Sequence, residues 1–235
     1  MVEIQNLTKY YGNKAALKGI SFTIKENEVL GFLGPNGAGK STTLNIMAGV
    51  IPATGGSVKI QGYDIAQQPV KAKRCIGFLP EIPPVYPDMK VREYLNFAAG
   101  LKGIPAAKRK GEVERVMERL KITDVQKRLI RNLSKGYKQR VGFAMAILGD
   151  PPVLILDEAT SSIDTRTEAL VQRGMDGLMY GRTSFVIAHR LSTVRNADCI
   201  VVLEQGRIIE RGSHDELIAK KGKYYQLYTG NLAEN

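Results

Sequence analysis

The residues best suited to chemistry lie in one glycine-rich stretch. It follows the pattern G-x-x-x-x-G-K-[ST] and reads Gly34, Pro35, Asn36, Gly37, Ala38, Gly39, Lys40, Ser41 and Thr42. Glycines let successive backbone N–H groups curl around phosphate oxygens. Lys40 can place a positive charge on the β- and γ-phosphates, and Ser41 can offer a hydroxyl to Mg²⁺. The pattern predicts a phosphate-binding loop, and the alternative is a turn that is merely rich in glycine.

Two adjacent acids follow the apolar run 153–156. At the end of a buried strand beside a phosphate loop, Asp157 can hold Mg²⁺ through its water shell. Glu158 points the other way and can polarise an attacking water. Alone, the pair could be two solvated acids at a strand end. Together with the phosphate loop, it indicates hydrolysis of a nucleotide.

The elements that must position these residues alternate between strand-like and helix-like patterns, which predicts an α/β domain with a largely parallel sheet. A Gly12-Asn13 turn joins the first two expected strands. We expect strands over 2–11, 20–34, 57–62, 75–80, 151–160 and 183–188, a hairpin over 200–211 that turns at Gly206, and helices over 40–50 and 165–179.

The pattern becomes helical between about 88 and 150. In the expected helix over 106–120, one apolar stripe indicates a core-facing side. Its members are Val113, Val116, Met117 and Leu120. Near the C-terminus, Ser213 and Glu216 have the spacing of a capping box, which predicts a short helix there.

Composition and charge narrow the class of protein. The 235 residues are 43% hydrophobic, which suits a globular domain, and no apolar run approaches the roughly 20 residues of a membrane span. The start shows no secretory signal, so cytosol is expected. Cys75 and Cys199 are far apart in sequence and are expected to be small apolar residues in a reducing compartment. Most of the net charge of +11 lies in residues 91–150, which hold 14 basic and 6 acidic groups.

With these motifs, the sequence resembles the ATP-binding cassette (ABC) ATPases that power ABC transporters, over essentially the whole chain. The resemblance implies a P-loop NTPase core with a mixed sheet: an N-terminal antiparallel β part, and a parallel ATP-binding part. It also implies an α-helical signature subdomain. Residues 1–84 and 151–235 would form the catalytic core, and 85–150 the helical subdomain, of a single nucleotide-binding domain.

The resemblance also implies roles for residues outside the phosphate loop. Tyr11 would stack on adenine, with Ala16 beside it, and the signature motif, Leu133 to Tyr137, would present Ser134 and Gly136 to a γ-phosphate. Asp164 would lie in the loop through which two cassettes sense each other. His189 would orient the attacking water. Simpler readings remain: strand packing for Tyr11, a helix N-cap for Ser134, and a structural hydrogen bond for His189.

Two departures from the family pattern are present. Glu81 stands where a glutamine usually contacts Mg²⁺ and the attacking water, and it adds negative charge near the phosphates. Lys135 and Tyr137 stand where Gly and Gln are usual in the signature motif. We interpret the second departure as a difference that is typical of a subfamily.

The two parts of the chain resemble different branches of this family. The part up to about residue 150 is similar to free-standing cassettes, whereas the part from Asp157 onward is similar to exporters with a fused membrane domain. The charge excess also ends near residue 150. Our hypothesis is a chimera, natural or engineered, joined within 141–160. The alternative is one natural protein from a sparsely sampled branch.

The resemblance implies ATP binding and hydrolysis with ATP and Mg²⁺ as cofactors, in a head-to-tail dimer with a second nucleotide-binding domain. It further implies transmembrane transporter subunits as partners, no nucleic acid, and a cytoplasmic place at the inner face of the cell membrane. The alternatives are a soluble ABC ATPase acting on nucleic acid, or a chimeric cassette that binds ATP without a transport partner. A GTPase is disfavoured, since no NKxD-type motif is present.

Overall fold

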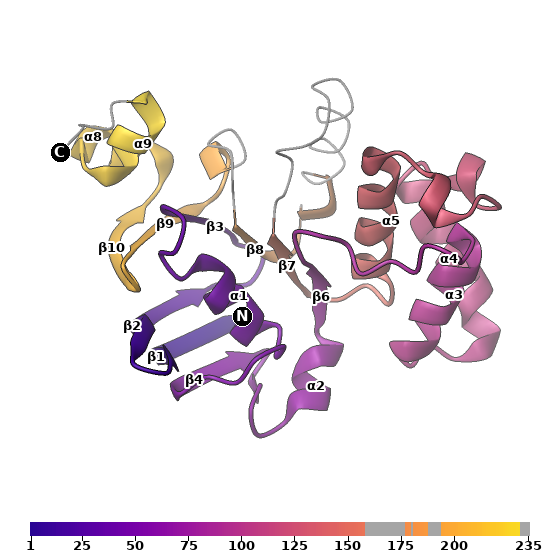
Figure 1. The fold of residues 1–235 in the computed structure, drawn as a ribbon, viewed down its shortest axis with the longest axis horizontal. Helices are drawn as coiled ribbons and strands as arrows, with labels where there is room; N and C mark the ends of the chain where they lie inside the picture. The colour runs from indigo at the N-terminus through magenta and orange to yellow at the C-terminus, as the bar shows by residue number, and fades with distance from the viewer. Residues whose placement is uncertain (158–176, 180, 188–193, 231–235) are drawn as a thin grey trace.

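The computed structural model of the protein describes residues 1–157, 177–179, 181–187 and 194–230. Two sheets and a group of helices make up these residues, as Figure 1 shows. The predicted helix over 165–179 lies almost entirely outside the described residues.

The larger sheet has six strands in the order β10-β9-β3-β8-β7-β6. Strands β9, β3, β8, β7 and β6 are parallel, and β10 closes the edge as an antiparallel partner of β9. Strands β7 and β8 are buried along their whole length, as strands covered on both faces of a parallel sheet must be. The bounds are β3 (Val29–Leu33), β6 (Ile76–Leu79), β7 (Val153–Asp157), β8 (Thr183–Ile187), β9 (Cys199–Glu204) and β10 (Arg207–Gly212).

The smaller sheet is antiparallel, in the order β2-β1-β4-β5. The expected Gly12-Asn13 turn is confirmed, with Gly12 at a φ of 57°. The single strand expected over 20–34 is wrong: a turn at 25–28 divides it between the two sheets, with Asn27 at a φ of 59°. The polar run 25–28 has no apolar side chain to bury. The bounds are β1 (Val2–Tyr11), β2 (Lys14–Ile24), β4 (Gly55–Ile60) and β5 (Tyr63–Asp64).

Helix α1 (Lys40–Met47) follows β3 and ends three residues earlier than predicted. Gly49 has a φ of 66°, the left-handed conformation that terminates helices, which explains the early end. The short helix α2 (Pro69–Arg74) begins at a proline and was not predicted.

The helices α3 (Val91–Leu101), α4 (Ala106–Arg119) and α5 (Lys135–Ile147) lie together beside the β6 edge of the larger sheet (Figure 1). We call residues 91–147 the helical region; it also contains the short 3₁₀ turns Thr123–Val125 and Ile130–Asn132. The predicted apolar stripe of α4 is confirmed, since all four of its members are buried. Helix α5 packs against α3, α4 and β6. The helical region is therefore attached to the sheet mainly through α5.

The C-terminal part contains the predicted hairpin, with Gly206 in its turn at a φ of 79°. Helix α8 (His214–Lys220) begins with the predicted capping box of Ser213 and Glu216. Helix α9 (Lys223–Thr229) follows and buries Tyr224, whose hydroxyl lies 2.7 Å from His214 Nδ1.

The two sheets share one apolar core. Phe22 of the smaller sheet packs against Phe32 and Phe185 of the larger, with ring centroids 5.7 and 6.2 Å away. Cys199 is buried in this core, Cys75 is half-buried, and both are free thiols. In the described part of the chain, no helix is both long and apolar enough to span a membrane.

Gly77 tests how tightly α5 packs on the sheet, and Gly111 serves as the control. A Cβ at Gly77 in β6 would lie 2.5 Å from the Ala146 carbonyl oxygen and 2.8 Å from Pro151 Cγ. Gly77→Ala should lower the free energy of unfolding by about 1–3 kcal/mol, because backbone must move. Gly111 in α4 has open space around it, so Gly111→Ala should raise stability by about 0.5–1 kcal/mol. Urea unfolding measures both, and unchanged stability in Gly77→Ala would contradict the packing described.

Candidate nucleotide-binding site

The glycine-rich loop connects β3 to α1 and lies against the β9–β10 hairpin. A side chain at Gly34, whose φ is 148°, would collide with the Leu203 carbonyl oxygen. The backbone N–H of Gly206 donates to the Ala38 carbonyl oxygen at 3.0 Å. The hairpin therefore fixes one side of the loop.

Lys40 begins α1 and is almost fully buried, with 8% of its surface exposed. Its Nζ donates to the carbonyl oxygens of Gly34 and Pro35, at 2.7 and 3.0 Å. Burial lowers the pKa of the Lys40 ammonium, and the nearby Asp157 carboxylate opposes that shift. The ammonium is thus held inside the curl of the loop, where a phosphate would enter.

A cavity of about 570 Å³ lies over this loop. This volume is within the usual range for small-molecule sites. The walls come from β1 and the start of β2, from the loop and α1, and from Glu81 after β6. The lining residues are Tyr11, Lys14, Ala15, Ala16, Asn36, Gly37, Gly39, Lys40, Ser41, Thr42 and Glu81.

The cavity brings together most of the predicted nucleotide residues. Tyr11 and Ala16 line it together with the loop, although they precede the loop by about twenty residues. Tyr11 is 52% exposed as a residue, and Lys9 Nζ lies 5.2 Å from its ring centroid. The ring is therefore not used in core packing, and it has a face available for stacking.

Three residues of the predicted loop support the site without lining the cavity. Gly34, Pro35 and Ala38 are absent from its walls, and Gly34 and Ala38 instead make the contacts to the β9–β10 hairpin. Lys14 and Ala15 line the cavity and were missed. Their place directly after the turn that follows Tyr11 is the signal that could have indicated them.

The predicted magnesium residues fit a cation held mostly by phosphate oxygens. Ser41 and Glu81 line the cavity, and Asp157, 5% exposed, lies close enough to Lys40 to oppose the lowering of the Lys40 pKa by burial. Among the described residues, no group of three or more His, Cys, Asp or Glu side chains gathers as a metal site. Mg²⁺ commonly takes only one or two protein ligands beside phosphates and waters, so this donor set suits it.

The signature residues lie on a different element from the cavity. Ser134 is the N-cap of α5, and its hydroxyl accepts a 3.4 Å hydrogen bond from the Tyr137 backbone N–H. Ser134 is exposed and Gly136 is buried, and neither lines the cavity. The N-cap reading of Ser134 is confirmed. The structure does not bring Ser134 or Gly136 to the loop within one chain.

Tyr137, one of the two departures in the signature motif, has a local explanation in the structure. Tyr137 donates its hydroxyl to Asp124 at 2.8 Å, and Arg140 lies over its ring at 5.3 Å.

Three other predicted site residues, Glu158, Asp164 and His189, lie outside the described residues.

Comparison with known proteins gives the family. The model of the ABC transporter family matches residues 17–161, well over half of the chain. The ATP-dependent lipid A-core flippase of Syntrophus aciditrophicus (strain SB) is 40% identical over all of this chain and 40% of its own length. The probable multidrug resistance ABC transporter YheH of Bacillus subtilis (strain 168) is 39% identical over 93% of this chain and 33% of its own. The chain spans less than half the length of these relatives.

Solved structures of ABC proteins share the fold. An ATP-binding subunit of an ABC transporter has a TM-score of 0.85 at 26% identity, with 98% of each chain covered. A bacterial Atm1-family ABC exporter with ATP bound has a TM-score of 0.81 at 33% identity, over 100% of this chain and 42% of that one. A dimeric cassette in a post-hydrolysis state with ADP and Pi has a TM-score of 0.81 at 26% identity, over 91% and 98%. This chain therefore belongs to the ABC transporter family and is an ATP-binding domain of that family.

Proposed function

We propose that the chain binds ATP with Mg²⁺ and hydrolyses it as the nucleotide-binding domain of an ABC transporter. The observation that carries the proposal is the cavity over the phosphate loop. It unites Tyr11, Lys40, Ser41 and Glu81 from separate parts of the chain. An exposed aromatic ring at one side and a buried ammonium at the other suit a base and a polyphosphate, respectively.

The placement of Ser134 supports a head-to-tail dimer as the active form. Ser134 caps the exposed N-terminus of α5, and the first turn of this helix has no acidic side chain, so the helix end favours a negatively charged partner. Since Ser134 does not line the cavity of its own chain, a second copy can present this end to the bound phosphates. The dimeric cassette among the similar structures supports this arrangement.

The chain's own groups would act mainly by positioning and by charge. Lys40 and the loop amides would hold the β- and γ-phosphates, while Tyr11 stacks on adenine and Ala16 packs beside it. Glu158 would accept a proton from the attacking water, and His189 would orient that water. Asp164 would lie in the loop through which the chain senses the partner copy. Mg²⁺, held near Ser41, Asp157 and Glu81, would neutralise charge on the phosphates when bound.

The partners and place of the protein follow from this role. The chain would pair with a second nucleotide-binding domain and with transmembrane transporter domains, at the cytoplasmic face of the cell membrane. We treat 1–84 and 151–235 as catalytic core and 85–150 as helical subdomain. The join within 141–160 stays a prediction, and an uninterrupted gene for this chain in a genome would contradict its engineered form.

Lys40→Ala should raise the dissociation constant for ATP more than about a hundredfold, because about 3 kcal/mol of charge-assisted hydrogen bonding is lost. Titration with a fluorescent ATP analogue measures the effect. Lys59→Ala is the matched control, since Lys59 is exposed on β4 and outside the cavity. Equal affinity in both variants would remove Lys40 from the phosphate site.

Tyr11→Ala should weaken ATP binding about threefold to tenfold, the effect of losing one aromatic stack. Tyr10→Ala is the control, because Tyr10 is equally exposed, at 50% against 52%, and does not line the cavity. The same titration measures both variants. An unchanged dissociation constant in Tyr11→Ala would contradict adenine stacking.

Glu158→Gln should keep ATP binding while turnover falls at least about a hundredfold, the usual effect of removing a general base. Phosphate release is measured over a range of protein concentrations, with Glu118→Gln on the exposed side of α4 as the control. Activity of the unaltered chain should rise with the square of its concentration while dimers are scarce. A linear rise would contradict the dimeric site, and full activity in Glu158→Gln would contradict its role as base.

A further inference from the structure

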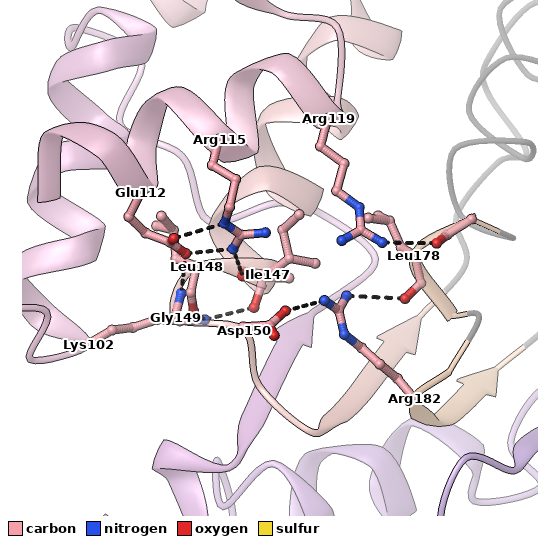
Figure 2. Close-up of polar contacts among 12 residues, drawn as sticks. Lys102, Glu112, Arg115, Arg119, Ile147, Leu148, Gly149, Asp150, Leu178 and Arg182 are labelled. Atoms are coloured by element: carbon pink, nitrogen blue, oxygen red, sulfur yellow. Dashed lines mark hydrogen bonds and ion pairs between the residues drawn. The ribbon is translucent and has the colours of Figure 1, made fainter. Parts of the chain in front are cut away.

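Charged side chains from three parts of the fold converge on the turn between α5 and β7. Figure 2 shows them around residues 147–150, at the opposite end of α5 from the signature motif. We call this cluster the α5–β7 brace and define it as Lys102, Glu112, Arg115, Asp150 and Arg182. None of these five residues lines the nucleotide cavity.

Two cations of the brace bind the last carbonyl groups of α5. Lys102, the C-cap of α3, donates from Nζ to the Ala146 and Leu148 carbonyl oxygens at 2.7 and 3.0 Å. Arg115 Nη2 donates to the Ile147 carbonyl oxygen at 3.4 Å. These carbonyls have no partner within the helix and form the negative end of its dipole. The C-terminus of α5 is thus fixed to α3 and α4.

Glu112 holds Arg115 and the turn together. Its carboxylate accepts two hydrogen bonds from Arg115, at 2.8 and 2.6 Å, and a third from the Gly149 backbone N–H at 2.7 Å. The Arg115 hydrogen bond is the largest cause that lowers the pKa of Glu112. Glu112 therefore remains charged and ties α4 directly to the turn.

The other side of the brace reaches the segment that leads into β8. Arg182, with 11% of its side chain exposed, pairs with Asp150 and donates to the Leu178 carbonyl oxygen at 3.2 Å. Arg119 of α4 donates to the Gly177 carbonyl oxygen at 3.0 Å. The brace and Arg119 together therefore link the helical region to the turn and to the segment before β8, and these contacts cross the suggested join within 141–160.

A small rotation of α5 about this turn would displace the other end of the helix. Helix α5 has 13 residues and is about 20 Å long, so a rotation of about 5° at its C-terminus moves Ser134 by about 2 Å. On the other side of the turn, the five residues of β7 end at Asp157. Displacements of about 1 Å at a reacting centre can reduce rates a hundredfold.

Stability alone is a weak reason for such a charged cluster. Burial lowers the pKa of Lys102 to about 8, which shows that the protonated ammonium is disfavoured there. Apolar side chains of α3, α4 and α5 already form one continuous core beside it. The five residues of the brace are half-buried or exposed, and ion pairs of this kind contribute little to the free energy of unfolding, so a role in geometry better explains the cluster.

We propose that the α5–β7 brace is a positioning device for ATP hydrolysis, which sets the angle of α5 so that Ser134 reaches the ATP of a partner copy. Lys102 is its central positioning residue. The inference rests on the proposed function, because it assumes that Ser134 completes a site in trans.

The first experiment separates positioning from folding. Lys102→Met keeps the apolar stem and loses the ammonium, and Lys102→Arg restores a cation. Arg131→Met is the control, because Arg131 lies in the same helical region and its ion pair with Asp88 is exposed. The side chains of Arg131 and Asp88 are 58% and 83% exposed, respectively. Turnover per folded molecule is measured well below the midpoint of thermal unfolding, together with ATP affinity. Lys102→Met should lower kcat about tenfold with the ATP dissociation constant unchanged, and Lys102→Arg should recover most of it.

A double-mutant cycle then tests whether Lys102 acts through Ser134. If it does, Lys102→Met should change kcat less than about twofold in a chain that already carries Ser134→Ala. An undiminished tenfold effect in that background would overturn the proposal. So would a Lys102→Met protein that melts earlier but keeps full kcat, because the brace would then only stabilise the fold.

A measurement without hydrolysis keeps the two proposals distinguishable. Nitroxide labels at Lys110→Cys on α4 and Lys59→Cys on β4, with Cys75→Ser and Cys199→Ser, report the distance between the helical region and the smaller sheet. Lys102→Met should broaden this distance distribution and Lys102→Arg should not; equal widths would overturn the brace. An unaltered chain that hydrolyses no ATP would instead refute the proposed function, with the label distances still deciding the brace.

Discussion

The backbone of Gly34 runs so close to the Leu203 carbonyl group that no side chain fits between them. This approach places the phosphate loop against the β9–β10 hairpin, and the Gly206 to Ala38 hydrogen bond secures it. Helix α1 begins directly after the loop, so the positions of Lys40 and Ser41 follow from the same contact. The rest of the cavity is built around a loop whose backbone is already fixed.

Two lysines, the buried Lys40 and the half-buried Lys102, show how this fold places positive charge. Lys40 and Lys102 are both disfavoured as cations by burial, and both donate to backbone carbonyl oxygens. Each also has an acid nearby, Asp157 for Lys40 and Glu112 for Lys102. A charge held by carbonyl dipoles and one carboxylate keeps a fixed place without a strong ion pair. One such lysine faces the cavity, and the other faces the turn that carries α5.

The sequence was sufficient wherever a local pattern has one structural meaning. The loop from Gly34, the Gly206 hairpin and the Ser213 capping box were all predicted correctly, because backbone sterics and hydrogen bonding allow few alternatives. The division of 20–34 between two sheets was missed, since strand propensity cannot tell which sheet a strand joins. Lys14 and the brace were missed for a related reason. Their partners are distant in sequence, and only the packed fold brings them together.

The walls of the cavity come from three stretches of chain: 11–16 at the first hairpin, 36–42 at the loop and α1, and Glu81 where the chain leaves β6. A molecule that fills this space contacts all three at once and acts as a reversible cross-link between them. The free energy of binding is then shared among the three stretches, so the bound molecule stabilises their arrangement. Occupancy of one small cavity thus adds to the cohesion of segments that lie up to seventy residues apart in the sequence.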